Sequence, residues 1–186
     1  NIGECWNKKS VTFMILGDIC TRNCSFCAVG KGKPKPPDLM EPSNIANMVQ
    51  KLNLNHVVIT SVDRDDLEDN GASHFVNTVN NIKTANPNTT IEVLIPDFIG
   101  YHNGINQVVE SKPDIINHNI ETISRLHSKV KPKSNYLHSL NLLKTTKKLN
   151  NKIFTKSGII LGLGETKTEI INLMNDLLSV NCDILT

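Results

Sequence analysis

Three cysteines lie close together near the start of the sequence. In the stretch "ICTRNCSFCAVG", residues 19 to 30, Cys20, Cys24 and Cys27 have the spacing C-x3-C-x2-C. Thiolates at this spacing on one loop can converge on a metal centre, and soft sulfur ligands favour zinc or an iron–sulfur cluster. The motif therefore predicts a metal site held by three thiolates.

The number of thiolates distinguishes between these metals. A structural zinc site has four ligands, usually from two separated pairs, whereas this stretch contains one C-x2-C pair. A 4Fe-4S cluster held by three cysteines leaves one iron without a protein ligand, and that iron can bind a substrate or a cofactor. The cluster fits the spacing better than the alternatives, which are a zinc knot and a thioredoxin-like C-x-x-C pair.

The composition narrows the class of protein. The chain has 186 residues, of which 39% are hydrophobic and 20% are charged, and its net charge is +2. This charge is too small to indicate binding to nucleic acid or to an anionic membrane surface, and no apolar run has the length of a membrane span. The five cysteines are odd in number and three of them are clustered, which argues against a disulfide framework and for a reducing compartment inside the cell.

Short β-branched runs alternate with longer amphipathic segments along the chain. We expect strands at 11–16, 56–61, 90–95, 114–119, 157–163 and 183–186, and helices near 43–53, 71–85, 103–111, 135–149 and 168–180. The strands are near-continuous apolar runs, as in sheets covered on both faces. Alternation at this spacing predicts a single α/β domain with a parallel sheet, either a barrel or doubly wound.

Polar residues follow the expected strands, where parallel sheets carry their chemistry. Asn117, Asn119 and Glu121 alternate, so their side chains are expected on one face of a strand, where they can bind a ribose or an amino acid head group. Ser61 and Asp63 alternate in the same way at the end of the second strand. For the acidic residues of that stretch, contact with a ligand and capping of the next helix are equally supported.

The arginines and the glycine-rich stretch indicate ligand binding less clearly. Arg22, Arg64 and Arg125 each follow an expected strand, where a guanidinium can bind carboxylates, although arginines in such loops are also often solvated surface residues. The stretch "GIILGLGET" lacks the third glycine of a dinucleotide-binding loop. Its small residues also suit a strand against which a helix packs closely.

Several segments resemble one known enzyme family. The motif C-x3-C-x-aromatic-C, with Phe26 as the aromatic residue, resembles the signature of the radical S-adenosylmethionine enzymes. The segments "MILGDICTRNCSFCAVGKGKP", "VVITSVDRDDLEDNGASHF", "EVLIPDF", "DIINHNIETISRLHSKVKP" and "TKSGIILGLGET" resemble the lipoyl synthases of that superfamily, in the same order and at similar spacing. The resemblance covers essentially the whole chain.

The resemblance implies a partial TIM-type barrel of about five βα units plus a sixth strand. It also implies insertion of two sulfur atoms into the octanoyl chain on a lysine of a lipoyl carrier protein, initiated by a 5′-deoxyadenosyl radical. The implied partners are an electron donor and the octanoylated carrier domains of 2-oxoacid dehydrogenase complexes or of the glycine-cleavage system, with no nucleic acid and no membrane. The implied location is the bacterial cytoplasm, or a mitochondrial or plastid-type matrix.

The resemblance also assigns roles to residues. It implies that Cys20, Cys24 and Cys27 are catalytic and hold the 4Fe-4S cluster that binds S-adenosylmethionine. The residues expected to bind cofactor are Phe26, Ser61, Asp63, Asn117, Asn119, Glu121, Gly158, Ile160 and Gly162. The last three match a G-x-I-x-G motif in which a strand supports the adenine.

A second cluster is implied at the start of the chain. Lipoyl synthases hold an auxiliary 4Fe-4S cluster with C-x4-C-x5-C and a serine near the C-terminus, and Cys5 in "NIGECW" matches the third cysteine. The other ligands would lie before residue 1 and after residue 186. We therefore expect a fragment lacking both ends, with residues 1–10 as a remnant of the auxiliary-cluster segment and two clusters in the full-length enzyme. Cys182 is expected to be a core residue.

Three classes of function remain open from the sequence. The first is a radical enzyme, in which a biotin-synthase-like sulfur insertion is the nearest rival to lipoyl synthesis. The second is an electron-transfer iron–sulfur protein, which is disfavoured because such clusters normally have four cysteine ligands. The third is a zinc-stabilised binding module.

Overall fold

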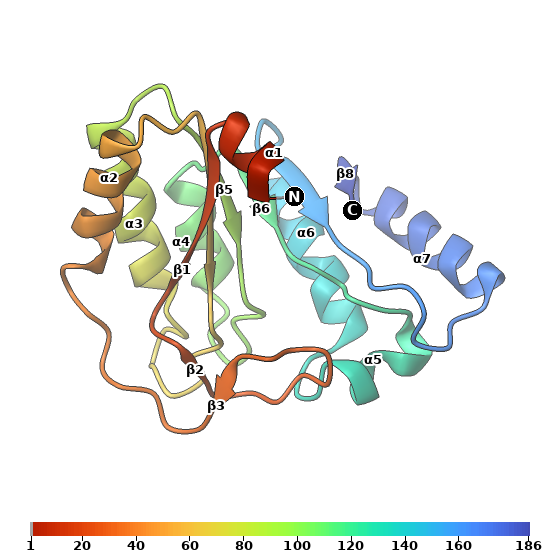
Figure 1. The fold of residues 1–186 in the computed structure, drawn as a ribbon. Coiled ribbons are helices and arrows are strands. Elements are labelled where there is room, and N and C mark those ends of the chain that lie inside the picture. The colour runs from red at the N-terminus through yellow and green to blue at the C-terminus, as the bar shows by residue number, and fades with distance from the viewer. Residues whose placement is uncertain (1) are drawn as a thin grey trace.

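The computed structural model describes residues 2–186, and its centre is a six-stranded parallel sheet (Figure 1). The strands are β1 (Ser10–Ile15), β4 (His56–Ser61), β5 (Thr90–Leu94), β6 (Ile115–Asn117), β7 (Phe154–Ser157) and β8 (Ile184–Leu185). They are neighbours in chain order, and every pair is parallel. In a doubly wound sheet the strand order reverses, so this order confirms the partial barrel and excludes the alternative.

The helices are α1 (Ile2–Asn7), α2 (Glu41–Lys51), α3 (Ala72–Ala85), α4 (Gly104–Glu110), α5 (Ser124–Val130), α6 (Tyr136–Leu149) and α7 (Lys167–Ser179). Of these, α2, α3, α4 and α6 cover the outer face of the sheet, whereas α1 lies at its amino end (Figure 1). Alternate strand residues, such as Ile59, Val93 and Ile116, are fully buried in the main hydrophobic core that the sheet forms with these helices. A second cluster around Leu143 and Leu173 joins α5, α6 and α7, and the half-buried Cys182 packs beside it.

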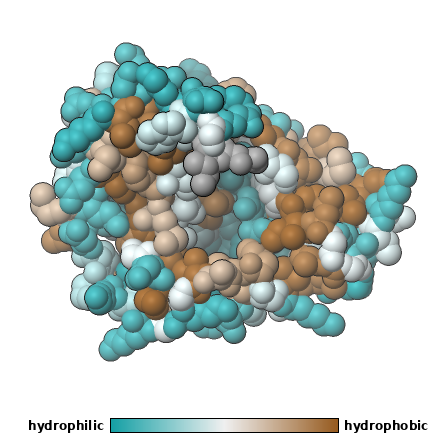
Figure 2. Space-filling model, in the orientation of Figure 1, coloured by the Kyte–Doolittle hydropathy of each residue, from teal (hydrophilic) through white to brown (hydrophobic). Residues whose placement is uncertain are grey.

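The other face of the strands forms the interior of the barrel. Because side chains alternate along a strand, Met14, Thr60 and Leu94 point to this side, and the strand register pairs Met14 with Thr60 and Thr60 with Leu94. Met14 and Phe154 are 45% and 56% exposed, since the sheet does not close into a full barrel. Figure 2 shows this open side as a hollow between hydrophobic surfaces.

Some element boundaries differ from the sequence prediction. The strand expected at 157–163 is β7, which ends at Ser157. Beyond Ser157 the pairing with the segment after β6 continues only as an isolated parallel bridge between Glu121 and Ile159, in which Glu121 N donates to Gly158 O at 3.0 Å and Ile160 N donates to Glu121 O at 2.7 Å. Gly162 then has a φ of +97°, which turns the chain away. The strand expected at 114–119 likewise ends at Asn117, so the prediction that Asn119 and Glu121 lie within a strand was wrong.

The helices expected from the sequence agree with the observed bounds to within about two residues, but short elements were missed. The capping box expected at Thr166 and Glu169 is present at the start of α7. The missed elements are α1, α5 and the two-residue strands β2 (Ile19–Cys20) and β3 (Gly30–Lys31). They are too short to show a hydrophobic period. Within residues 2–186, none of the helices combines the length and apolar character that crossing a membrane requires.

Candidate functional site

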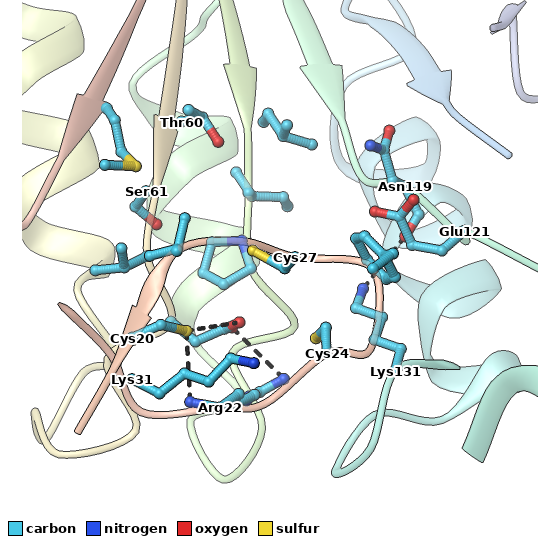
Figure 3. Close-up of a pocket in the computed structure, with 18 residues that line it drawn as sticks. Cys20, Arg22, Cys24, Cys27, Lys31, Thr60, Ser61, Asn119, Glu121 and Lys131 are labelled. Atoms are coloured by element: carbon cyan, nitrogen blue, oxygen red, sulfur yellow. Dashed lines mark hydrogen bonds and ion pairs between the residues drawn. The ribbon is translucent and has the colours of Figure 1, made fainter. Parts of the chain in front are cut away.

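A cavity of about 300 Å³ lies at the carboxyl ends of the strands (Figure 3). The loop that carries the three cysteines forms one wall, and the ends of β1, β4 and β5 with the segment after β6 form the others. The predicted site residues that line it are Cys20, Cys24, Phe26, Cys27, Ser61, Asp63, Asn119 and Glu121. Segments far apart in the sequence therefore meet at one cavity.

The cysteine loop, residues 20 to 31, is closed at its base by a short parallel ladder. Ile19 pairs with Gly30 and Cys20 pairs with Lys31, and Gly32 N donates to Cys20 O at 3.1 Å. Within the loop, Cys27 N donates to Cys24 O at 3.2 Å and forms a turn. This closure holds the three thiols around the same cavity, as Figure 3 shows.

The far side of the cysteine loop is attached to the end of α5. Ser25 donates to Val130 O from its backbone nitrogen at 3.0 Å and from Oγ at 3.3 Å. Thr21 N donates to Asp63 O at 3.1 Å on the other side of the loop. The loop is thus fastened to two different βα units of the barrel.

Arg22 is the main link between the cysteine loop and the sheet. Its side chain is 2% exposed, and its Nε and Nη2 donate to Asp65 at 3.0 and 2.7 Å. Its Nη1 binds Asp97 and lies 3.5 Å from Asp63. Burial lowers the pKa of Arg22, but the hydrogen bonds to Asp65 and the charges of Asp63 and Asp97 outweigh it and raise the pKa overall. The guanidinium therefore stays ionised and ties the loop to the ends of β4 and β5.

The other two arginines have different environments. Arg64 is also buried, where its Nη1 donates to Leu16 O at 3.1 Å and its Nε lies 2.8 Å from Asp66. Arg125 is exposed and pairs with Glu169 at 2.8 Å. The surface interpretation is therefore wrong for Arg22 and Arg64 and right for Arg125.

Asp97 and Lys131 extend the network below the cysteine loop. Lys131 Nζ donates to Asp97 Oδ1 and to Asn119 O, both at 3.2 Å. Burial opposes ionisation of Asp97, but the contacts with His118, Lys131 and Arg22 hold its pKa well below the usual range. His118 is 1% exposed and its Nδ1 donates to Ile95 O at 3.0 Å. Sequence reasoning missed Asp97 and Lys131, because each lies far along the chain from the cysteines it supports.

Two acidic side chains face the cavity. Burial raises the pKa of Glu121 and of Asp63, although Lys131 and Arg22 respectively act in the opposite direction. Glu121 has a φ of +68°, which is unusual for a residue with a side chain. Its two backbone bonds to the segment after β7 hold it in this conformation. The carboxyl group is therefore fixed at the cavity wall.

Other expected site residues lie elsewhere. Asn117 is buried beside the cavity, and its Nδ2 donates to Glu92 Oε1 at 3.1 Å. Ile160 and Gly162 are on the loop after β7 and are not part of the cavity wall within the described residues. Cys5 is exposed on α1, which lies at the opposite end of the sheet from β2 and β3 (Figure 1).

The chemistry of the donors fits an iron–sulfur cluster. Burial, with the nearby Asp63, raises the pKa of Cys24 to about 11, and burial also raises that of Cys20, so the metal itself must stabilise the thiolates. Across residues 2–186, no three His, Cys, Asp or Glu side chains lie close enough to hold a single ion. Thiols spread around a cavity suit a group of several irons.

The polar atoms of the cavity wall fit a bound cofactor. Among the described residues, Ser61 Oγ and Asn119 Oδ1 are buried without a hydrogen-bond partner. Buried polar atoms normally have partners, so these atoms suit a polar ligand. Phe26 is 40% exposed over the cavity and offers an apolar surface.

Gly158 is expected to tolerate no side chain. A Cβ there would lie 2.7 Å from Asn119 Oδ1 and 3.3 Å from Thr186 Oγ1. We expect Gly158→Ala to lower the free energy of unfolding by about 1–3 kcal/mol, measured by urea denaturation, because the overpacking displaces Asn119. The control is Gly3→Ala, where a Cβ meets nothing within 4 Å. Equal stability of the two variants would contradict the close packing at Gly158.

A family model and two curated relatives match this chain. The model of the Radical SAM superfamily matches residues 14–177. The chain is 55% identical over 186 residues to a lipoyl synthase of Caldanaerobacter subterraneus subsp. tengcongensis and 54% identical to one of Caldicellulosiruptor saccharolyticus. Each alignment covers 100% of this chain and 65% of the relative, so the chain spans about two thirds of their length.

Solved structures share the fold. Methylornithine synthase superimposes with a TM-score of 0.72 at 14% identity, over 98% of this chain and 56% of that chain. Streptococcus suis SuiB bound to S-adenosylmethionine superimposes with a TM-score of 0.74 at 10% identity, over 99% of this chain and 42% of that chain. These structures show the shared fold, and the match of the family model over residues 14–177 shows that the chain belongs to the radical S-adenosylmethionine superfamily.

Proposed function

We propose that the longer protein containing this chain is a lipoyl synthase. It would insert two sulfur atoms into the octanoyl chain on a lysine of a lipoyl carrier protein, such as the lipoyl domains of 2-oxoacid dehydrogenase complexes or the glycine-cleavage carrier. The observation that carries the proposal is the 55% identity to a lipoyl synthase over the whole chain.

Membership of the superfamily implies S-adenosylmethionine and a 4Fe-4S cluster as cofactors. We propose that Cys20, Cys24 and Cys27 hold the cluster, with one iron left for S-adenosylmethionine. When bound, these cofactors supply the radical chemistry that activates a C–H bond. Supporting this assignment, the three thiols line one cavity and no fourth cysteine lies in its wall among the described residues.

The remaining cavity residues would bind and orient the cofactor and the substrate. Ser61, Asp63, Asn119 and Glu121 offer hydroxyl, amide and carboxyl oxygens that suit the hydroxyl and amino groups of S-adenosylmethionine. Leu94 and its neighbours form an apolar wall that suits an acyl chain and excludes water. We propose that Gly158, Ile160 and Gly162 support this arrangement from the segment after β7, and that Asn117 does so from β6.

We also propose that Cys5 binds a second 4Fe-4S cluster, which serves as the sulfur source. Its thiol is exposed on α1, where it is accessible to ligands supplied by further residues of a longer protein. On this proposal residues 1–10 belong to the auxiliary-cluster segment and the rest of the chain forms the single radical core domain. The curated relatives are longer than this chain, which leaves room for the other ligands.

Mass spectrometry of the carrier tests the proposed function. The longer protein, reconstituted with iron and sulfide, is incubated with S-adenosylmethionine, a reductant and an octanoylated carrier domain. We expect two sulfur atoms to be added, and we expect residues 1–186 alone to add none because most ligands of the second cluster are missing. A carrier left unmodified by the longer protein while S-adenosylmethionine is cleaved would refute the proposal.

A further inference from the structure

The interior of the barrel contains an ion pair next to the cavity. Glu92, whose side chain is 4% exposed, accepts hydrogen bonds from Lys156 Nζ at 2.9 and 3.2 Å. The interiors of such barrels are usually filled by branched aliphatic side chains. An ion pair with one buried and one partly buried side chain adds little net stability, because desolvation offsets the attraction of the charges. The pair is therefore better explained by its position than by stability.

The strand register places Glu92 one step beyond the apolar cavity wall and Lys156 level with Leu94 in that wall. Met14 and Leu94 line the cavity, and Glu92 lies two residues before Leu94 on the same face of β5. Two residues along a strand correspond to roughly 7 Å. Lys156 reaches Glu92 from β7, across β6. The charged groups of the pair thus lie within one step of the apolar cavity wall, toward the amino ends of the strands.

Neighbouring groups hold the pair in place and keep Glu92 ionised. Asn117 Nδ2 donates to Glu92 at 3.1 Å, and His56 Nε2 lies 3.7 Å from Glu92 Oε2. Ser10 Oγ lies 2.8 Å from His56 Nδ1 and extends the polar layer to β1. Burial raises the pKa of Glu92, but His56, Lys156 and Asn117 lower it overall. The layer spans the barrel interior from β1 to β7.

We propose that the Glu92–Lys156 pair is the floor that limits how far an acyl chain can enter the barrel, so that it selects octanoyl over longer chains. This inference rests on the proposed function. Each methylene that contacts the apolar wall gains free energy by leaving water. A methylene pushed against the ion pair would instead have to displace charged groups from their partners. The free energy of that displacement is larger than the free energy gained by burying the methylene. Affinity should therefore stop rising at the length at which the chain meets the pair.

The wild-type protein tests the floor without any mutation. Peptides carrying hexanoyl-, octanoyl- or decanoyl-lysine are titrated into the reconstituted longer protein by calorimetry. We expect octanoyl to bind about tenfold more tightly than hexanoyl, since two more methylenes are buried. Decanoyl should bind no more tightly than octanoyl. If affinity rises by a further factor of about ten from octanoyl to decanoyl, the floor does not exist.

A double variant tests the residues themselves. Glu92→Leu with Lys156→Met replaces both charges by apolar groups, a change that proteins often tolerate. We expect its preference for decanoyl over octanoyl to rise about tenfold. The control, Arg125→Gln with Glu169→Gln, removes an exposed ion pair, and glutamine can still complete the capping box. It should keep the wild-type profile. A folded double variant with the wild-type profile overturns the inference. If the variant does not fold, the titrations of the wild-type protein decide whether the floor exists.

The failures of the two proposals are distinguishable. Octanoyl and decanoyl carriers are supplied together in the sulfur-insertion assay. If the wild-type protein modifies neither carrier, the proposed function fails, and the peptide titrations still decide whether the floor exists. If it modifies both equally, the lipoyl synthase assignment stands and the floor is overturned.

Discussion

Replacing any one of Cys20, Cys24 and Cys27 by alanine is expected to abolish cleavage of S-adenosylmethionine. Two thiolates cannot hold a 4Fe-4S cluster in the orientation that leaves one iron open to the cavity. The cysteine loop contains no other thiol, and within the described residues no further cysteine lines this cavity. We expect activity to fall to background, which is the largest effect among the substitutions proposed for this protein.

Iron, sulfide and the cleavage products measure this effect together. Each variant is reconstituted without oxygen and assayed for iron and sulfide per chain and for products of S-adenosylmethionine cleavage. Cys182→Ala is the matched control, because Cys182 is half-buried and its Sγ lies 3.4 Å from Ile184 O, away from the cavity. We expect the control to load iron as the wild type does. Wild-type iron content and cleavage in an alanine variant of the loop would refute the assignment of that cysteine.

Arg22→Ala is expected to lower the free energy of unfolding by about 3–5 kcal/mol. The substitution leaves Asp97, whose side chain is fully buried, without its guanidinium partner, and removing one member of a buried ion pair has a cost of this size. Arg22→Lys should recover only part of the loss, since a single ammonium cannot bind Asp65 and Asp97 in the same way as the planar guanidinium. Urea denaturation of the cluster-free protein measures both variants.

Arg125→Ala is the control for the loss of an arginine. Arg125 forms an ion pair with Glu169 but is exposed, so solvent replaces the lost contact and stability should change little. We also expect Arg22→Ala to retain less iron after reconstitution, because the cysteine loop loses its link to β4 and β5. If Arg22→Ala and Arg125→Ala had the same effect on stability, the network around Arg22 would not hold the loop.

The parallel strands and the residues at their carboxyl ends could be predicted from the sequence. The β-branched run at 56–61 coincides with β4, because this run is apolar, is bounded by polar residues and has no competing period. Parallel strands bring their carboxyl ends to one edge, so Ser61, Asp63, Asn119 and Glu121 were correctly expected near the cysteines. Local pattern and topology were sufficient for these residues.

The contacts across the barrel could not be predicted in this way. Arg22 and Asp97 are 75 residues apart, and Glu92 and Lys156 are 64 apart, so no local pattern pairs them. The apolar run after Ser157 favours a strand, but it pairs with the segment after β6 only through the bridge between Glu121 and Ile159 before Gly162 turns the chain. Tertiary structure, and not local sequence, decides these features.

The electron paramagnetic resonance spectrum of the reduced, reconstituted protein tests most directly whether the three thiolates leave one iron open to a cofactor. The spectrum is recorded before and after addition of S-adenosylmethionine, using residues 1–186 and the variant with all three loop cysteines replaced by alanine. We expect the wild-type chain to show the signal of a reduced 4Fe-4S cluster that changes when S-adenosylmethionine is added, and the variant to show no such signal. A cluster signal that S-adenosylmethionine leaves unchanged, or a chain that binds zinc in place of iron, would contradict the open iron site.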